Sequence, residues 1–214
     1  MIGKGRAIVH TRASMAYGLR ESKKAEIVHR QHVSGETAKE ITQEFAFLHQ
    51  FNLQCRKNTL GFVLSPTIKD GQNLEIKDMG EIVQRFLKEM KLLDHQAAAF
   101  VHRNRAHVHL HVYANRINFG GKAYDDSFVG NRSSLAAETV AKSMGLTTAR
   151  EVQQQKLEQT KEIRAEIKGI HERVIARDRP RDFDGYLRAM EKYQVKLLPH
   201  INKQNELQGF GTTT

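Results

Sequence analysis

The sequence predicts an α+β fold in which an antiparallel β-sheet of about five strands is flanked by helices. Strand-like and helix-like segments interleave along the chain, and 39% of the 214 residues are hydrophobic, which is enough for a packed core. Two strand-like segments, residues 96–101 and 108–116, follow each other across the polar turn 103–106, which is a hairpin signal. Because a hairpin joins antiparallel strands, the sequence favours an antiparallel sheet over a doubly wound parallel one.

The N-terminal part of the chain alternates between strands and helices. Apolar residues at three- and four-residue spacing predict the helices, and Ser34 or Gly35 is a suitable N-terminal cap for the second of them. A compact apolar run that stops at Pro66 is typical of a strand. The expected elements are a strand from Lys4 to His10, helices from Ala13 to His29 and from Thr37 to Asn52, and a strand from Thr59 to Ser65.

Residues 78–90 give the clearest amphipathic helix. Asp78 stands at its start, where a carboxylate stabilises the positive end of the helix dipole. The apolar residues fall on one helical stripe, formed by Met79, Ile82, Val83, Phe86, Leu87 and Met90. Such a stripe predicts a helix that packs against the core.

The C-terminal part is predicted to be mostly helical. The segment 148–178 lacks proline and places its apolar residues at mostly helical spacing, which indicates one long surface helix. The expected elements are an extended piece from Lys122 to Asp126, a helix from Ser133 to Met144 capped by Gly145, the long helix, a short helix around residues 183–190, and a strand pair at residues 195–198 and 209–210. We therefore expect a core at residues 1–147 and a segment at residues 148–214 that completes it.

The chain is strongly basic. Its formal net charge of +10 comes from 34 Lys and Arg against 24 Asp and Glu, an excess that favours a polyanionic partner, most commonly nucleic acid. No apolar run approaches the roughly 20 residues that span a bilayer, and residues 1–5 lack a signal-peptide core, so we expect a cytoplasmic protein without a membrane segment. The single cysteine, Cys55, excludes an intrachain disulfide and a cysteine-based zinc cluster.

Histidines gather in the predicted hairpin. Because a strand alternates its faces, every second residue from 107 to 115 lies on one side, and the residues between them are apolar. The shared side holds His107, His109, His111, Tyr113 and Asn115. Same-side neighbours are roughly 6.6 Å apart, so two imidazoles of the row can bind one ion but three cannot do so easily.

A further metal ligand must then come from a neighbouring strand, and His102, across the turn, is the obvious candidate. A single histidine in a sheet is more often a hydrogen-bonded spacer, but four histidines between residues 102 and 111 favour a divalent metal site. Strand geometry alone does not choose between His107 and His111.

This stretch resembles the relaxase and mobilization nuclease family, a branch of the HUH endonucleases that nick DNA at an origin of transfer. The family pattern H-x6-H-x-H-x3-N matches His102, His109, His111 and Asn115. Weaker matches, such as Leu64-Ser65-Pro66 and the closing segment up to Phe210, extend the resemblance over nearly the whole chain.

The resemblance implies an HUH endonuclease fold, with residues 1–147 as the catalytic core. It selects His102, His109 and His111 as ligands of a divalent ion, Mn²⁺ or Mg²⁺ before other divalent ions. It leaves His107 and Asn115 as supporting residues or alternative ligands. One position departs from the pattern: many relatives have Asp two residues after the first ligand, where this chain has Asn104.

The resemblance also implies a tyrosine nucleophile near the N-terminus, and Tyr17 occupies the matching position. Attack by its phenol on the scissile phosphate gives a 5′-phosphotyrosyl DNA and a free 3′-hydroxyl. A phenol has an ordinary pKa near 10, so its attack at neutral pH needs a base or a cationic field. Tyr113, on the ligand face, and His10 are the rival nucleophiles.

The expected partner is single-stranded or hairpin DNA from an origin of transfer, and a mobilization accessory protein is a further possible partner. The predicted phosphate-binding residues are Arg12, Arg20, Arg103, Arg105 and Arg116. The function implied is site- and strand-specific nicking by tyrosine transesterification. The alternatives are a metal-dependent phosphodiester hydrolase, in which bound water attacks, an HUH replication initiator, and a basic DNA-binding module without activity.

Overall fold

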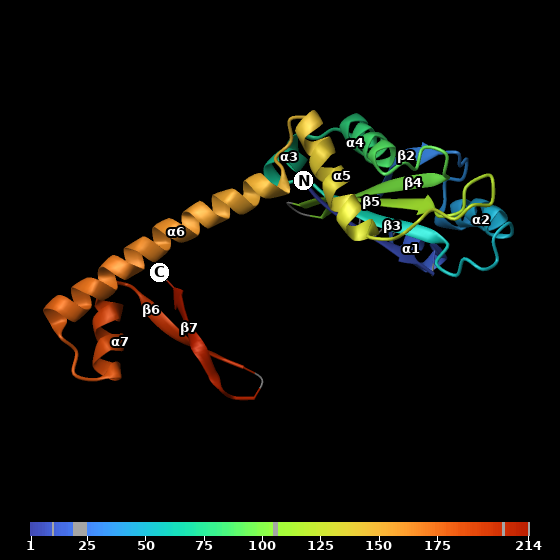
Figure 1. The fold of residues 1–214 in the computed structure, drawn as a ribbon. Coiled ribbons are helices and arrows are strands. Elements are labelled where there is room, and N and C mark those ends of the chain that lie inside the picture. Colours follow the sequence, from blue (N-terminus) through green and yellow to red (C-terminus); the bar gives the residue numbers. More distant parts are fainter. Residues whose placement is uncertain (10, 19–24, 105–106, 203, 214) are drawn as a thin grey trace. The chain divides into compact units, whose positions relative to one another are not determined.

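A computed structural model of the chain describes residues 1–9, 11–18, 25–104, 107–202 and 204–213, without the side chains of residues 17, 18, 103, 104, 107, 207, 210, 212 and 213. This part of the chain forms two compact units, residues 1–152 and residues 153–214. The first unit is the α+β fold that the sequence predicts (Figure 1).

A five-stranded sheet forms the centre of the first unit. Its strand order is β1-β3-β5-β4-β2, and every neighbouring pair is antiparallel, which confirms the predicted sheet. The strands are β1 (Ile2–Ile8), β2 (Glu26–Gln31), β3 (Thr59–Ser65), β4 (Ala97–Asn104) and β5 (His107–Asn115). The hairpin β4–β5 contributes the two inner strands that carry the histidines.

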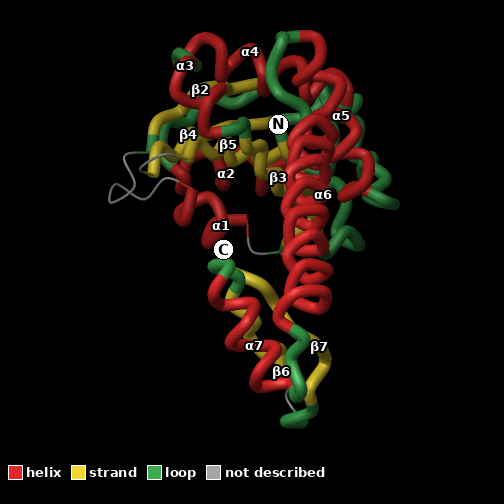
Figure 2. Tube along the Cα trace, turned by 90° about the vertical axis from the view of Figure 1, so that its left-hand side faces the viewer, coloured by secondary structure: helices red, strands yellow, loops and turns green. Residues whose placement is uncertain are grey.

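Helices cover the two faces of this sheet unequally. One face is covered by α4 (Ile76–Glu89) and α5 (Val129–Ser143), and the other is partly covered by α1 (Thr11–Gly18) and α2 (Ala38–His49), as Figures 1 and 2 show. The short helix α3 (Ile68–Asn73), which the sequence did not predict, follows β3.

The main hydrophobic core lies between the sheet and the α4–α5 layer. Phe62 of β3 and Phe86 of α4 are both buried, and their ring centroids are 5.1 Å apart. Burial of such a side chain contributes roughly 1.5–3 kcal/mol to folding. Gly3 lets α5 approach β1 closely, because a Cβ at this residue would lie 2.5 Å from the Cβ of Ala137. The predicted stripe of α4 thus packs against the core.

A smaller cluster lies on the opposite face, beneath α1 and α2. Met15 of α1 and Phe45 of α2 are fully buried there against Phe100 of β4 and Tyr113 of β5. These helices leave the hairpin end of the sheet less covered, so His109 and His111 are only half-buried. The fold therefore presents the histidines on the face that is not filled by the main core.

The predicted helix from Ala13 to His29 is wrong beyond its first turns. Helix α1 ends at Gly18, and residues 26–31 form strand β2, which pairs with β4. As neighbouring residues of a strand do, Ile27 and Val28 lie on opposite faces: Ile27 packs on the α1–α2 side and Val28 packs against the main core. Two consecutive apolar residues in an edge strand imitate the pattern of a helix.

Helix caps were predicted with mixed success. Thr37, and neither Ser34 nor Gly35, caps α2, because its side chain accepts the backbone N–H of Glu40 while the Glu40 carboxylate accepts the N–H of Thr37. Gly145 follows α5 with φ +66°, a left-handed conformation that glycine adopts without strain, as the sequence predicts.

The second unit begins within the predicted long helix and contains the predicted short helix and strand pair. The elements are α6 (Ala149–Arg173), which continues as a π-helical turn η2 (Val174–Asp178), then α7 (Phe183–Lys192), β6 (Lys196–Ile201) and β7 (Leu207–Thr213). A small cluster of its own, built on Val174, Ala189, Met190 and Val195, packs these elements together. The functional division predicted at residue 147 stays a prediction. None of the described helices is long and apolar enough to cross a membrane.

Candidate functional site

Three cross-strand rows form the sheet face that α1 and α2 partly cover, which we call the histidine face. Residues directly opposite each other on antiparallel strands point to the same side, with neighbouring strands about 4.8 Å apart. The rows are His102–His109–Ser65, Phe100–His111–Val63–Lys4 and Ala98–Tyr113–Gly61–Arg6. The register therefore brings the three predicted metal ligands to adjoining positions on one face.

One pair of imidazoles joins the two strands of the hairpin. The ring centroids of His102 on β4 and His111 on β5 are 4.4 Å apart, with 45° between the ring planes. His109 stands directly opposite His102 in the register. His102 is 2% exposed, so packing around it restricts its ring, while His109 and His111 are half-buried.

Ser65, the last residue of β3, supports His109. Its Oγ lies 2.8 Å from Nδ1 of His109. If Nδ1 donates this hydrogen bond, Nε2 carries the lone pair that a metal ion requires, so the serine can hold the imidazole in the metal-binding tautomer. The sequence drew attention to Ser65 through the Leu64-Ser65-Pro66 match but assigned no role to it.

The histidine side chains are the candidate ligands of a metal centre at this face. Among the residues whose side chains the structure describes, no group of three His, Cys, Asp or Glu side chains is already arranged to hold an ion. The backbone nevertheless places three imidazoles, the ligands of many divalent ions, at adjoining positions of two paired strands.

Helix α1 is anchored over the histidine face by Tyr113. The hydroxyl of Tyr113 donates a 2.7 Å hydrogen bond to the backbone carbonyl of Ser14, and Tyr113 is only 6% exposed. This bond fixes α1 one turn before Tyr17, whose backbone completes the helix and whose side chain lies outside the described part. Because its hydroxyl is buried and engaged, Tyr113 is the weaker candidate for a nucleophile. His10, the other rival, lies outside the described residues.

Asn115 lies at the end of β5 remote from the turn, in a buried polar network. Its Oδ1 accepts hydrogen bonds from the ring of His49 at 3.1 Å and from the N–H of Ile117 at 3.0 Å. Its Nδ2 donates to the carbonyl of Phe45 at 3.1 Å and to Oε1 of Gln96 at 3.0 Å. The amide is therefore fully used, which favours a supporting role over direct metal ligation.

Two histidines, His49 and His95, contact Asn115 in this network. Burial lowers the pKa of His49 and that of His95, whose Nδ1 donates a 2.8 Å hydrogen bond to the carbonyl of Asn115. Thr11 of α1 and Thr59 of β3 continue the polar contacts with a hydroxyl pair 2.6 Å apart. The network thus ties α1 and α2 to the end of the central strands.

The predicted phosphate-binding arginines have different surroundings. Arg116 donates to Asp126 at 2.6 Å and to the carbonyls of Tyr124 and Lys57 at 2.8 and 3.2 Å, so its guanidinium connects loops. Arg12 is exposed and lines a cavity of about 580 Å³ between α1 and α2. Arg20 and Arg105 lie outside the described residues, as do the side chains of Arg103, Asn104 and His107.

Sequence reasoning missed two cations beside the histidines. Lys4 and Arg6 lie on the edge strand β1, in the rows that contain His111 and Tyr113, and both are exposed. The signal was present in the alternation of Gly3-Lys4-Gly5-Arg6, which places both charges on one side of a strand and both glycines on the other.

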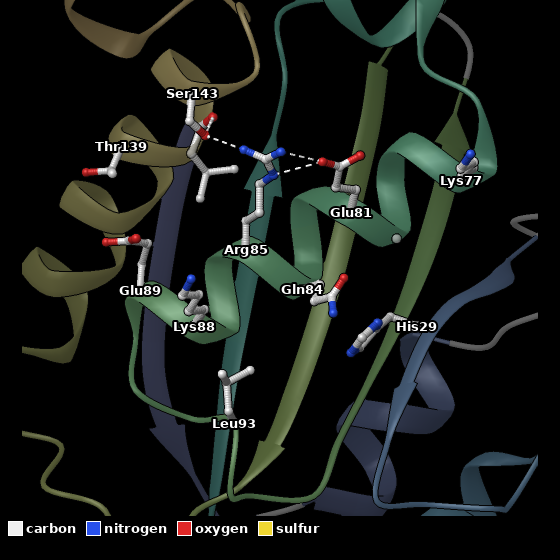
Figure 3. A pocket seen from close by; sticks show the side chains of 12 residues that line it. His29, Lys77, Glu81, Gln84, Arg85, Lys88, Glu89, Leu93, Thr139 and Ser143 are labelled. Atoms are coloured by element: carbon white, nitrogen blue, oxygen red, sulfur yellow. Dashed lines mark hydrogen bonds and ion pairs between the residues drawn. The ribbon is translucent and has the colours of Figure 1, made fainter.

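A larger cavity of about 840 Å³ lies on the other face, between α4, α5 and β2 (Figure 3). Its central residue, Arg85, donates to the carboxylate of Glu81 and, at 3.1 Å, to Oγ of Ser143. The wall combines Lys77 and Lys88 with Glu81 and Glu89, so it has no single charge preference. Size alone therefore does not make this cavity the reactive site.

Comparison with known proteins identifies the family of the chain. The family model described as "Relaxase: MobA/VirD2-like, nuclease domain" matches residues 17–146, more than half of the chain. The search of curated proteins found no match. The search of solved structures likewise found none. The matched range begins at Tyr17 and spans the sheet strands from β2 to β5, the histidine hairpin and α5, so the chain belongs to the MobA/VirD2-like relaxases, whose nuclease domain nicks DNA in mobilization.

Proposed function

We propose that the chain nicks one strand of an origin of transfer by transesterification, with Tyr17 as nucleophile and a divalent ion held by His102, His109 and His111. The observation that supports this most is the register that places His102, His109 and His111 at adjoining positions of two paired strands, on the sheet face that α1 partly covers. The family supports DNA nicking in general, and the proposal adds the residues and the chemistry.

The residues fit a divalent ion by their chemistry. Relaxases of this family are generally dependent on a divalent metal. Neutral imidazoles bind such ions through one ring nitrogen, and three protein ligands leave positions open for the substrate. When bound, the ion supplies Lewis-acid polarisation of the phosphate oxygens and a template for the strand. The proposal takes Mn²⁺ or Mg²⁺ as the ion.

The reaction exchanges one phosphate ester for another. The phenolic oxygen of Tyr17 forms a bond to phosphorus and loses its proton, while the bond from phosphorus to the 3′ oxygen breaks and that oxygen gains a proton. The products are a 5′-phosphotyrosyl strand and a free 3′-hydroxyl. Because one ester replaces another, the step conserves its energy and is reversible without ATP.

Cationic side chains also lie beside the histidine face, where they can contact the DNA strand. Lys4 and Arg6 stand beside the row of His111, and the chain carries a net charge of +10. Cations at these positions attract phosphates and lower the free energy of a phenolate at Tyr17. The expected affinity for single-stranded DNA therefore falls steeply with salt concentration.

An end-labelling experiment tests the proposed reaction. Single-stranded oligonucleotides that cover the origin of transfer are incubated with the protein and Mn²⁺ and resolved on a denaturing gel. We expect a covalent protein–DNA adduct that contains the label only when the label lies 3′ of the nick, and a shorter free strand that ends in a 3′-hydroxyl. Cleavage without an adduct would instead indicate attack by water.

Replacing Ser65 by alanine tests the support of His109. Removal of the hydroxyl frees the Nδ1 atom, so both tautomers become accessible and the affinity for Mn²⁺ should fall by about 10- to 100-fold, the usual loss for such supporting groups. The measurement is calorimetric titration of the protein with Mn²⁺. Ser65→Thr keeps a hydroxyl and should restore most of the affinity, whereas equal affinity of Ser65→Ala and the parent chain would refute this role.

A further inference from the structure

Helix α1 depends on its contacts with the rest of the first unit for its position. It has eight residues, and isolated helices shorter than roughly 12–15 residues are marginal in water. Among its residues whose side chains the structure describes, the buried ones are Thr11 and Met15, which are four positions apart and therefore share one helix face. This face determines where the rest of the helix lies, including the backbone of Tyr17.

A buried pair of hydroxyl groups anchors the start of α1. The Oγ atoms of Thr11 and Thr59 lie 2.6 Å apart, and both side chains are buried. Thr59 is a rigid base, because β3 pairs with both β1 and β5, and Thr59 stands opposite Ile8 and Asn115 in the register. Thr11 also donates a longer hydrogen bond of 3.4 Å to Oδ1 of Asn58, so Thr59 is the donor in the hydroxyl pair.

A second anchor lies in the middle of the helix. Tyr113 donates its hydroxyl to the carbonyl of Ser14, and the neighbouring Met15 is fully buried. Ser14 comes three residues after Thr11 and three residues before Tyr17. If the helix pivots about Ser14, the backbone of Tyr17 moves about as far as Thr11 does, because both are roughly 4.5 Å from Ser14 along the helix axis. An anchor in the middle leaves this tilt free, and the contact at Thr11 removes that freedom.

We propose that the Thr11–Thr59 hydroxyl pair positions Tyr17 by fixing the tilt of α1 over the histidine face. The inference rests on the proposed function, in which the phenolic oxygen of Tyr17 attacks phosphorus. Such an attack requires the reacting atoms to be aligned and about 3–3.5 Å apart, and a misplacement of about 1 Å costs roughly 100-fold in rate. Thr11 acts through the helix, so it is a positioning residue, and Tyr17 remains the residue that reacts.

Valine variants separate the tilt of the helix from the stability of the fold. Valine has nearly the shape of threonine, so it removes the hydroxyl with little change in packing. Thr11→Val deprives the buried hydroxyl of Thr59 of this partner, which lowers stability. The double variant Thr11→Val/Thr59→Val removes both hydroxyls, and replacing both partners of a buried hydrogen bond by apolar groups of the same shape is nearly neutral for stability.

Single-turnover kinetics with single-stranded origin DNA and Mn²⁺ test the proposal. They give the maximal rate of adduct formation and the DNA concentration at half of that rate. Thr11→Val should lower the maximal rate by about 10- to 100-fold and change the half-saturating concentration by less than about twofold, because the phosphate contacts remain. Thr11→Ser keeps the hydroxyl and should retain most of the rate. The double variant should regain the urea midpoint of the parent chain while its rate stays as low as that of Thr11→Val.

Thr160→Val is the matched control, because it removes an exposed hydroxyl that donates to the carbonyl of Lys156 in α6, and it should behave like the parent chain. If the parent chain forms no adduct, the proposed function fails. If it forms the adduct and Thr11→Val reacts at the parental rate, the positioning role is refuted while the nicking function stands. Recovery of both rate and urea midpoint in the double variant also refutes it, because the hydroxyl pair would then serve only stability. Should circular dichroism show that Thr11→Val does not fold, the rate of the double variant decides the question.

Discussion

Replacing His111 by alanine should abolish metal-dependent nicking and leave the fold intact. Loss of one of three ligands removes most of the affinity for the ion, and with it several kcal/mol of stabilisation of the transition state, which corresponds to about a thousandfold loss of rate or more. His111 is a cleaner choice than His102, because His102 is 2% exposed and its truncation would also leave a cavity in the sheet.

The His111 variant needs two measurements and a matched control. Nicking of origin DNA in Mn²⁺ reports the activity, and calorimetric titration with Mn²⁺ reports the ligand set. His200→Ala, which removes an exposed histidine from β6 in the second unit, should behave like the parent chain in both. Retention of Mn²⁺ binding and activity by His111→Ala would exclude this histidine as a ligand.

Tyr17→Phe should eliminate the covalent adduct and preserve binding of single-stranded DNA within about threefold. The substitution removes only the attacking oxygen, whereas phosphate contacts, which dominate affinity, remain. Denaturing gels measure the adduct and fluorescence anisotropy measures the binding. A loss of adduct together with a loss of DNA binding would point to a damaged helix and not to a missing nucleophile.

Tyr113→Phe is the informative comparison for Tyr17→Phe. It deletes the hydroxyl that donates to the carbonyl of Ser14 and should lower the free energy of unfolding by about 0.5–1.5 kcal/mol, the usual net contribution of one hydrogen bond. The rate should fall moderately as α1 loosens over the histidine face, but the adduct should persist. Loss of the adduct in Tyr113→Phe with its survival in Tyr17→Phe would reverse the two assignments.

Local sequence patterns predicted the elements that are regular. Strand β3 agrees with its predicted limits, and α4 and the hairpin β4–β5 follow from periodicity because each packs one apolar face against the core. Strand β2 was mistaken for a helix because both of its faces are covered, so the consecutive residues Ile27 and Val28 are both apolar. Periodicity reports which face of an element is buried, and it fails where both faces are packed.

The sequence predicted only those parts of the candidate site that come from residues close together along the chain. Alternation in one strand placed His109 and His111 on one face, and the hairpin turn brought His102 opposite His109. Ser65 lies 44 positions before His109, and Arg6 belongs to an edge strand two strands away, so only the strand order reveals that they share this face. Contacts that depend on sheet topology are not encoded in a local pattern.

The central claim is that Tyr17 attacks a phosphate held at the histidine face, and peptide mapping of the adduct tests it most directly. The protein is incubated with origin DNA and Mn²⁺, digested with trypsin and nuclease, and the peptide that retains a nucleotide is sequenced by mass spectrometry. The account predicts a 5′-phosphoryl nucleotide on Tyr17, within the tryptic peptide that runs from Ala13 to Arg20. A nucleotide on Tyr113, or efficient nicking with no modified peptide, would contradict it.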